Sequence, residues 1–257
     1  MGGVKVIAIA NQKGGVGKTS TAVNLSAALA ARGKKILLID VDSQANASSA
    51  LGIFAESEQS LYQCLIGSKS VEELIMPAKR RNLFILPSHM DLSGVEVELT
   101  LGGNHTSCIR EALEPLRRSS RFDYVILDTP PSLGVLMMGS LCAADEVLTP
   151  LQCEFLSLEG LSRILYVIDQ VRESGINPDL VHEGVIMTMY NNTNLANQVV
   201  AQVRQNMPGK LYDTVIPRAV RVAEAPSFGR TVMEHDPDGA AARAYKKAAQ
   251  EFLRRHR

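Results

Sequence analysis

The hydrophobic positions of this chain form short, nearly continuous apolar runs that alternate with longer segments of helical periodicity. The first run, Val4–Ala10, is followed by Lys18–Arg32, where apolar residues recur every three or four positions until Gly33. The run is typical of a buried strand, and the spacing that follows is typical of an amphipathic helix. Further apolar runs predict strands at Lys35–Asp40, Leu83–Leu86, Tyr124–Asp128, Glu146–Pro150, Gly184–Tyr190 and Leu211–Ile216.

Helical segments separate most of these strands. They are expected at Thr106–Arg118, Leu158–Glu173, Leu195–Asn206 and Gly239–Arg255. Buried strands alternating with helices predict an α/β fold, with one domain over residues 1–257 and a mainly parallel, twisted sheet covered by helices on both faces. The segments Ala55–Ser70 and Met90–Asn104 are expected to be surface excursions.

Ligands of such sheets bind beyond the carboxyl ends of the strands. One crevice is therefore expected to be surrounded by Asn11–Thr19, Asp40–Asn46, Asp128–Ser132 and the residues after Tyr190.

Composition narrows the class of protein only slightly. The 27 basic and 27 acidic residues cancel, which argues against a uniformly basic surface but leaves room for a local basic patch. The four cysteines form no C-x-x-C pair, so neither a zinc site nor a disulfide framework is expected. Without a signal peptide or a long apolar run, a cytoplasmic location is expected.

The clearest chemical signal is the segment NQKGGVGKTS, Asn11–Ser20, between the first strand and the first helix. Its glycines allow a tight turn whose N–H groups can point at one anion, and the helix dipole adds to this attraction. Lys18 would neutralise phosphate charge, and the Thr19 hydroxyl would bind Mg²⁺. The turn glycines are Gly14, Gly15 and Gly17.

The loop departs from the usual G-x-x-x-x-G-K-[ST] pattern at two positions. Gln12 stands where the first glycine is expected, and Lys13 adds a charge before the turn. The Lys13 side chain is expected to point away from the phosphates of its own loop. It is either a solvated surface lysine or a residue that reaches a phosphate held by another subunit, as an arginine finger does.

Three carboxylates lie where two predicted strands end. Asp128 ends one strand and precedes Thr-Pro-Pro, which suits a Mg²⁺ ligand, with a turn-capping aspartate as the alternative. Asp40 and Asp42 lie two positions apart and so on the same side of the chain. Because two carboxylates repel a triphosphate, one is expected to support Mg²⁺ and the other to orient the attacking water. A purely structural pair is the alternative.

Four segments together carry a family resemblance. They are Lys13–Thr19 (K-G-G-x-G-K-[ST]), Asp40–Asn46 (D-x-D-x-Q-x-N), Val125–Pro131 (Walker B) and Ile216–Pro226 (I-P-R-x-V-R-x-x-E-A-P). These motifs resemble those of the ParA/Soj partition branch of the ParA/MinD class of ATPases, whose first motif is a deviant Walker A. The resemblance extends from about residue 4 to residue 255.

The resemblance implies a P-loop ATPase that hydrolyses ATP to ADP and phosphate and forms a sandwich homodimer when ATP binds. Lys13 would contact the nucleotide across the interface, beside the closely packed Gly14, and Asp42 would position the water. Thr19, Asp40 and Asp128 would hold Mg²⁺. The nucleotide would be bound by Gly14, Gly15, Val16, Gly17, Lys18, Thr19 and Ser20, with Pro217 and Arg218 near adenine.

ParA-type ATPases bind double-stranded DNA nonspecifically as ATP dimers and release it after hydrolysis stimulated by a ParB/Spo0J-like protein. The resemblance thus implies a nucleoid-associated cytoplasmic protein. From Asp238 to Arg257 six basic residues stand against two acidic ones, although a solvated helix end would look the same. Asn192 replaces an arginine that related proteins often carry. The candidate DNA contacts are Arg204, Arg218, Arg221, Lys246 and Lys247.

Three alternatives bear on this interpretation. Val4 already belongs to the first strand, so no separate N-terminal helix-turn-helix domain for operator binding is expected. A MinD-like membrane-cycling ATPase would need bulky apolar residues on its last helix, whereas this one is rich in alanine, and no stable membrane insertion is expected. An orphan ATPase that positions another cargo would share the same chemistry and remains open.

Overall fold

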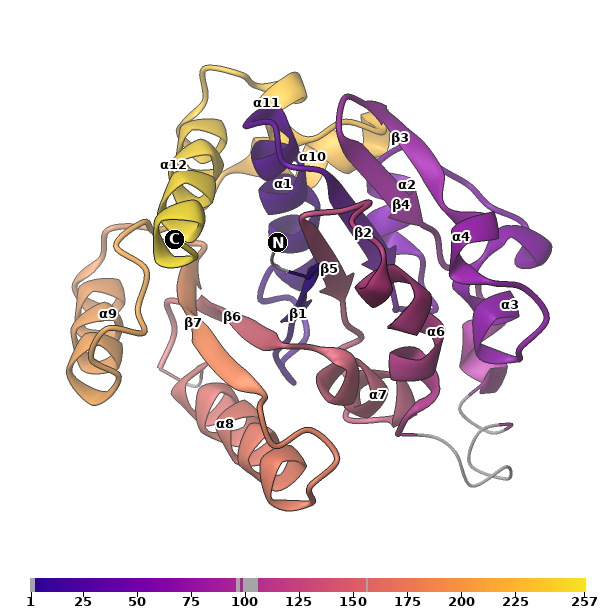
Figure 1. Ribbon diagram of the computed structural model, residues 1–257. Helices are drawn as coiled ribbons and strands as arrows, with labels where there is room; N and C mark the ends of the chain where they lie inside the picture. Colours follow the sequence, from indigo (N-terminus) through magenta and orange to yellow (C-terminus); the bar gives the residue numbers. More distant parts are fainter. Residues whose placement is uncertain (1–2, 96–97, 99–105, 156) are drawn as a thin grey trace.

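The computed structural model describes residues 3–95, 98, 106–155 and 157–257. Within them a seven-stranded sheet has the order β3-β4-β2-β5-β1-β6-β7 (Figure 1). All neighbouring pairs are parallel except β3 and β4. The strands are β1 Lys5–Ile9, β2 Ile36–Asp40, β3 Met76–Arg80, β4 Leu83–Leu86, β5 Tyr124–Asp128, β6 Glu146–Gln152 and β7 Val181–Thr188.

Helices cover both faces of this sheet, as predicted. On one face α1 packs beside α12, and on the other lie α6, α7 and α8 (Figure 1). Each face has its own apolar core, because strands buried on both sides present side chains to both layers. The helices are α1 Lys18–Ala31, α2 Asn46–Ala50, α3 Leu61–Leu65, α4 Val71–Leu74, α6 Cys108–Arg118, α7 Val135–Ala143, α8 Ser157–Glu173, α9 Asn194–Asn206, α10 Val220–Glu224, α11 Val232–His235 and α12 Ala240–Arg255.

The apolar side of α12 is turned into the domain. Ala241, Ala244, Tyr245, Ala248 and Phe252 are all buried, which confirms that this side packs against the protein. No helix among the described residues has the length and apolar character needed to cross a membrane.

The predicted strand Leu211–Ile216 is wrong. This segment runs beside β7 but makes only one isolated bridge, between Leu211 and Val185, because part of its backbone bonds to a side chain instead. The N–H groups of Asp213 and Thr214 donate to the two carboxylate oxygens of Glu251 on α12, at 2.8 and 2.9 Å. Edge strand β3 escaped prediction because its sequence, MPAKR, is polar and contains a proline.

The expectation of a surface excursion at Ala55–Ser70 is also wrong in part. Helix α3 lies in this segment, and its Leu61, Cys64 and Leu65 are buried in the core. The second expected excursion, Met90–Asn104, includes buried Leu92. Its residues 96–97 and 99–104 lie outside the described part of the chain.

Candidate nucleotide-binding site

The parallel register brings the sequence-predicted carboxylates together. Asp40 and Asp128 are register partners at the carboxyl ends of β2 and β5, and Ile9 at the end of β1 is the other partner of Asp128. Because β1 leads directly into the glycine loop and α1, the carboxylates and the loop meet at one edge of the sheet. Three of the four segments predicted around the crevice therefore meet there, whereas the residues after Tyr190 do not line it.

A cleft of about 320 Å³ lies at this edge. Gly15 and Gly17 have positive φ angles of 74° and 87°, which residues with side chains rarely adopt. The loop is also tied to the end of β7, because the Thr188 hydroxyl donates to the Val16 carbonyl at 2.8 Å. The cleft is lined by Gly14, Gly15, Gly17, Lys18, Thr19, Ser20, Asp42, Asn46, Pro131 and Met189.

Lys18 is buried at the start of α1 and points back along the loop. Its Nζ donates to the Lys13 carbonyl at 3.1 Å. Burial lowers the pKa of Lys18, and the carboxylates of Asp128 and Asp42 partly oppose that shift. A polyanion in the cleft would favour the charged ammonium further.

Asp128 is fully buried, and neither of its carboxylate oxygens has a hydrogen-bond partner in the described structure. Burial raises the pKa of Asp128 well above its usual value, the nearby Asp40 raises it further, and the Thr19 hydroxyl opposes both. A buried, unpartnered carboxylate destabilises a protein unless a cation or a donor compensates it. The carboxylate oxygens of Asp128, beside Thr19, therefore suit Mg²⁺, which prefers oxygen ligands.

Asp40 has a different environment from Asp128, although both are buried. One Asp40 oxygen accepts the N–H and the hydroxyl of Ser48 at 2.8 and 2.7 Å, and the other accepts the Asp42 N–H at 3.3 Å. Burial raises the pKa of Asp40, and the Ser48 bonds oppose the rise. Asp40 thus anchors helix α2 beside the cleft.

Asp42 lies on the wall of the cleft, as the water-positioning role requires. Its carboxylate accepts the Gln44 N–H at 3.0 Å, and its carbonyl accepts the Ser88 hydroxyl at 2.6 Å. The Ser88 N–H in turn donates to Ser48 at 3.1 Å. Sequence reasoning missed both serines, because Ser88 lies 46 residues from Asp42 and no spacing signals their contact.

Lys13 does not line the phosphate cleft, in agreement with the predicted direction of its side chain. Its N–H donates to the Asn11 side chain at 3.0 Å, and its Nζ lies 3.1 Å from a carboxylate oxygen of Glu154, just after β6. A neighbouring pocket of about 240 Å³ is lined by Gln12, Lys13, Glu159, Gly160 and Arg163. Glu154 is a further residue that the sequence did not single out.

The candidate adenine residues lie beside the end of β7 rather than in the phosphate cleft. Pro217 forms a parallel bridge with Tyr190, and the Arg218 N–H donates to the Tyr190 carbonyl at 2.9 Å. Met189, just before Tyr190, has a φ of 52°, an uncommon conformation for a residue with a side chain. Because Met189 lines the phosphate cleft, the strained turn at Met189 connects the cleft with the candidate adenine residues Pro217 and Arg218.

A second cavity, of about 250 Å³, adjoins the phosphate cleft and shares three residues with it. Arg230 also lines this cavity, so a cation lies near the phosphate cleft. The shared residues are Thr19, Ser20 and Asn46.

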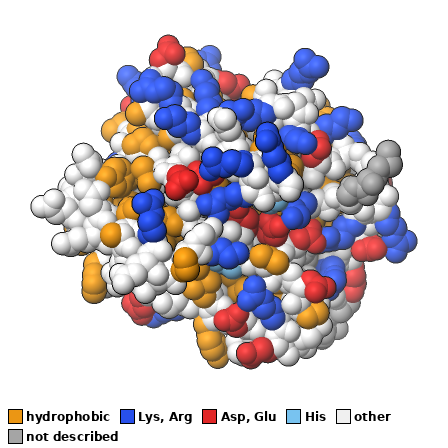
Figure 2. Space-filling view, turned by 60° about the vertical axis from the view of Figure 1, so that its left-hand side comes forward, with side chains coloured by type: hydrophobic (Ala, Val, Ile, Leu, Met, Phe, Trp, Pro, Cys, Tyr) orange, Lys and Arg blue, Asp and Glu red, His pale blue; other side chains and the backbone are white. Residues whose placement is uncertain are grey.

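The candidate DNA contacts fall into two groups. Arg204 approaches Asp213 at 3.9 Å, a carboxylate that it shares with Arg254, and Arg221 pairs with Glu224 at 2.8 Å, so both already face a carboxylate. Arg218, Lys246 and Lys247 are exposed and have no carboxylate partner in the described structure. Figure 2 shows Lys and Arg side chains concentrated in the upper part of the face on which α9 and α12 lie.

Comparison with known proteins identifies the family. Residues 4–182 match a family model described as an AAA domain. The chromosome partitioning protein ParA of Caulobacter vibrioides is 47% identical over 99% of this chain and 96% of its own length. The sporulation initiation inhibitor protein Soj of Bacillus subtilis is 44% identical over 96% of this chain and 97% of its own.

A solved structure extends the comparison to bound ligands. Cobyrinic acid a,c-diamide synthase from Mycobacterium smegmatis, with a bound ATP analogue and magnesium, has a TM-score of 0.85 and 31% identity. The similarity covers 99% of this chain and 96% of that one. The fold is therefore that of a known nucleotide-binding protein.

Proposed function

This chain belongs to the ParA/Soj family of chromosome-partitioning ATPases, and we propose that it is a Mg²⁺-dependent ATP hydrolase that works as a DNA-segregation switch. In this proposal ATP binding forms a sandwich homodimer, the dimer binds DNA nonspecifically in the nucleoid, and a ParB-type partner triggers hydrolysis and release. The observation that carries the proposal is the unpartnered carboxylate of Asp128 beside Lys18 and Thr19.

The ATP site is supported by the charges around the cleft. The loop N–H groups, Lys18 and the start of α1 together favour a triphosphate. Thr19 and Asp128, with Asp40 behind them, would hold Mg²⁺, which neutralises phosphate charge when bound. The ATP analogue and magnesium in the Mycobacterium smegmatis structure support the same assignment.

Hydrolysis is assigned to the carboxylate of Asp42. This residue lines the same cleft as the glycine loop, and it is held there by Ser88 through its carbonyl and by Gln44 through its carboxylate. A fixed acceptor orients a water for in-line attack on the terminal phosphate, and positioning accounts for much of the catalysis in this kind of reaction.

The dimer is supported by exposed apolar side chains at the edge of the sheet that carries the cleft. Leu133, Phe155 and Leu195 are 50%, 68% and 47% exposed, and they follow the ends of β5, β6 and β7. Covering such side chains is favourable by about 25 cal/mol per Å² of apolar surface. Lys13 lies at this edge too, beside Glu154, where it could reach a nucleotide bound by a second copy.

Nonspecific DNA binding is supported by the exposed cations without carboxylate partners. Each phosphate contact is weak and sensitive to salt, so a dimer that presents the surface twice binds much more strongly than a monomer. Arg218 and Lys247 are better candidates than the paired Arg204 and Arg221. The MinD-like alternative loses its proposed membrane anchor, because the apolar side of α12 is buried in the domain.

A DNA-binding assay with ATP, with ADP and without nucleotide tests the proposal. We expect the protein to retard a nonspecific duplex only with ATP and Mg²⁺, and the affinity to fall steeply as salt increases. Equal binding in all three nucleotide states, or ATP-dependent binding to anionic lipid vesicles instead of DNA, would refute it.

A further inference from the structure

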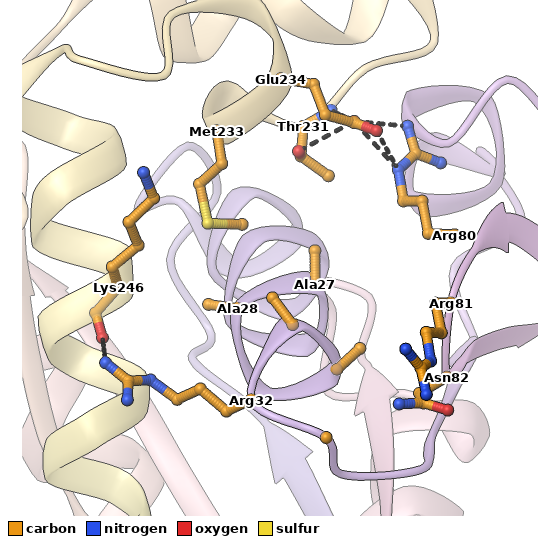
Figure 3. Close-up of a pocket in the computed structure, with 13 residues that line it drawn as sticks. Ala27, Ala28, Arg32, Arg80, Arg81, Asn82, Thr231, Met233, Glu234 and Lys246 are labelled. Carbon is orange, nitrogen blue, oxygen red and sulfur yellow. Dashed lines mark hydrogen bonds and ion pairs between the residues drawn. The ribbon is translucent and has the colours of Figure 1, made fainter.

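A groove of about 800 Å³ lies at the far end of α1 from the phosphate loop (Figure 3). Helix α1 begins at Lys18 in the nucleotide site and has 14 residues, so its last turn lies about 20 Å away. The groove is bounded by the end of α1, the turn between β3 and β4, the α11 region and α12. It therefore shares no residue with the phosphate cleft.

The floor of this groove is apolar. Ala31 at the end of α1 is exposed in it, Ala27, Ala28 and Ala30 line it with only 8%, 2% and 4% of their surface exposed, and the thioether side chain of Met233 stands above the helix (Figure 3). Such small side chains leave room for an apolar group to lie against the helix. The floor thus suits a ligand that has an apolar side of its own.

One charged pair at the rim belongs to the framework. Arg80 and Glu234 form an ion pair at 2.7 Å, and Glu234 also caps α11 by accepting the backbone N–H of Thr231 at 2.8 Å. Arg80 donates in addition to the Gly229 carbonyl at 2.9 Å. The charges of Arg80 and Glu234 cancel, and their hydrogen bonds connect β3 with the α11 region. This pair therefore adds no net charge to the groove.

The remaining charges at the rim are all positive. Arg32 donates to the Lys246 carbonyl at 3.1 Å, and the Lys246 ammonium donates to the Pro237 carbonyl at 3.1 Å. Arg81 lies across the groove from Lys246 (Figure 3). None of the three has a carboxylate within ion-pair distance in the described structure, so the groove keeps an excess of three positive charges in a chain whose total charge is zero.

We propose that this groove is a docking site for an acidic peptide segment of a partner protein, a function beyond the ATP-driven cycle proposed above. Acidic side chains would pair with Arg32, Arg81 and Lys246 on both rims, and small apolar side chains would lie on the alanine floor. A small anion would use the cations but not the floor, and duplex DNA offers phosphates but no apolar side. The peptide therefore matches both features of the groove.

Docking there is independent of the nucleotide. The groove lies at the opposite end of α1 from the edge proposed to close in the dimer, so it stays open in the monomer and in the dimer. A partner bound by this groove would remain attached through the ATP cycle.

Fluorescence anisotropy with a labelled 14-residue peptide of Glu and Ala, with Glu at helical spacing, tests the proposal on the full chain. The matched probe has Lys in place of Glu. We expect only the acidic peptide to bind, equally with ATP, with ADP and without nucleotide, and less tightly as salt increases. Arg32→Glu combined with Arg81→Glu should weaken binding at least tenfold.

The control reverses two charges outside the groove, Lys69→Glu at a partly exposed position with Arg118→Glu at an exposed one, and should bind like the wild type. Circular dichroism melting verifies that both double variants are folded. Three results would overturn the proposal: no binding of the acidic peptide, equal loss in both double variants, or displacement by a nonspecific duplex whose own affinity falls with Arg32→Glu and Arg81→Glu. The last result would make the groove part of the DNA surface.

Discussion

The ammonium group of Lys13 lies 3.1 Å from Oε2 of Glu154, so the additional lysine of the phosphate loop is paired within its own chain. The other Glu154 oxygen accepts the side-chain amide of Gln152 at 2.7 Å, which fixes the carboxylate at the end of β6. If Lys13 contacts a nucleotide in a second subunit, it must leave this pair. Exposed ion pairs contribute only about 0.2–1 kcal/mol, so the pair restrains Lys13 without locking it.

Replacing Glu154 should therefore make dimerisation easier. Glu154→Gln keeps the shape of the side chain and removes the charge that holds Lys13. We expect the ATP-dependent dimer to form at roughly two- to fivefold lower protein concentration, which corresponds to the strength of an exposed pair. Light scattering over a dilution series measures this shift. Glu159→Gln, which breaks a nearby pair with Arg163, serves as the control, and weaker dimerisation of Glu154→Gln would contradict the restraint.

Asp42→Ala should separate ATP binding from hydrolysis. The Asp42 carboxylate accepts one backbone N–H near the cleft, whereas Asp40 accepts three bonds that hold α2, so truncating Asp42 disturbs the fold less. We expect turnover to fall by about 100-fold or more, equivalent to about 2.7 kcal/mol of transition-state stabilisation, with ATP still bound. Phosphate release and nucleotide-binding assays measure the two properties. Normal turnover would remove Asp42 from the mechanism.

The pKa of Asp128 makes a prediction about stability and pH. Burial and Asp40 raise this pKa in the folded state, so the folded protein binds more protons than the unfolded chain. Without nucleotide, the contribution of Asp128 to stability is then lost as pH rises from the ordinary value of 3.8 to the raised value. Asp128→Asn should melt at a higher temperature than the wild type at pH 8 without ligand.

The same variant should lose most of the stabilisation that MgATP gives. The wild type should melt several degrees higher when MgATP is added, because a ligand of the folded state stabilises it. Thermal melting of both proteins, with MgATP and with EDTA, provides the comparison. A wild-type melting temperature above that of Asp128→Asn in EDTA, or equal MgATP shifts in the two proteins, would count against Asp128 as a group that needs a cation.

The unpaired cations should contribute more to DNA binding than the paired ones. Arg218→Glu with Lys247→Glu should weaken ATP-dependent DNA binding more than Arg204→Glu with Arg221→Glu, because the second pair already faces carboxylates. Removing two phosphate contacts should also reduce the slope of log affinity against log salt by about 1.8 per subunit. ATP binding, measured in parallel, checks the nucleotide site. Equal affinities for the two double variants would contradict this ranking.

The sequence predicts the site best where short segments decide the chemistry. The glycine loop, Asp40 and Asp128 are recognisable because apolar strands end directly before them, and parallel strands bring those ends together. Glu154 and Ser88 were missed because each acts through a contact far along the chain, 141 residues between Lys13 and Glu154 and 46 between Asp42 and Ser88. Ser48 lies only eight residues from Asp40, but no motif marks a serine at that spacing as its partner. The strand predicted at Leu211–Ile216 failed because of another distant contact, since Glu251 accepts the backbone N–H groups of Asp213 and Thr214 in the middle of the segment.

In the proposed cycle, ATP makes this protein a dimer through Lys13. Sedimentation velocity tests it on Asp42→Ala, which should retain ATP, and on Asp42→Ala combined with Lys13→Ala. We expect the single variant to sediment as a dimer with MgATP and as a monomer with MgADP, and the double variant to bind ATP but stay mainly monomeric. A single variant that is monomeric with MgATP, or a double variant that dimerises as fully as the single one, would contradict it.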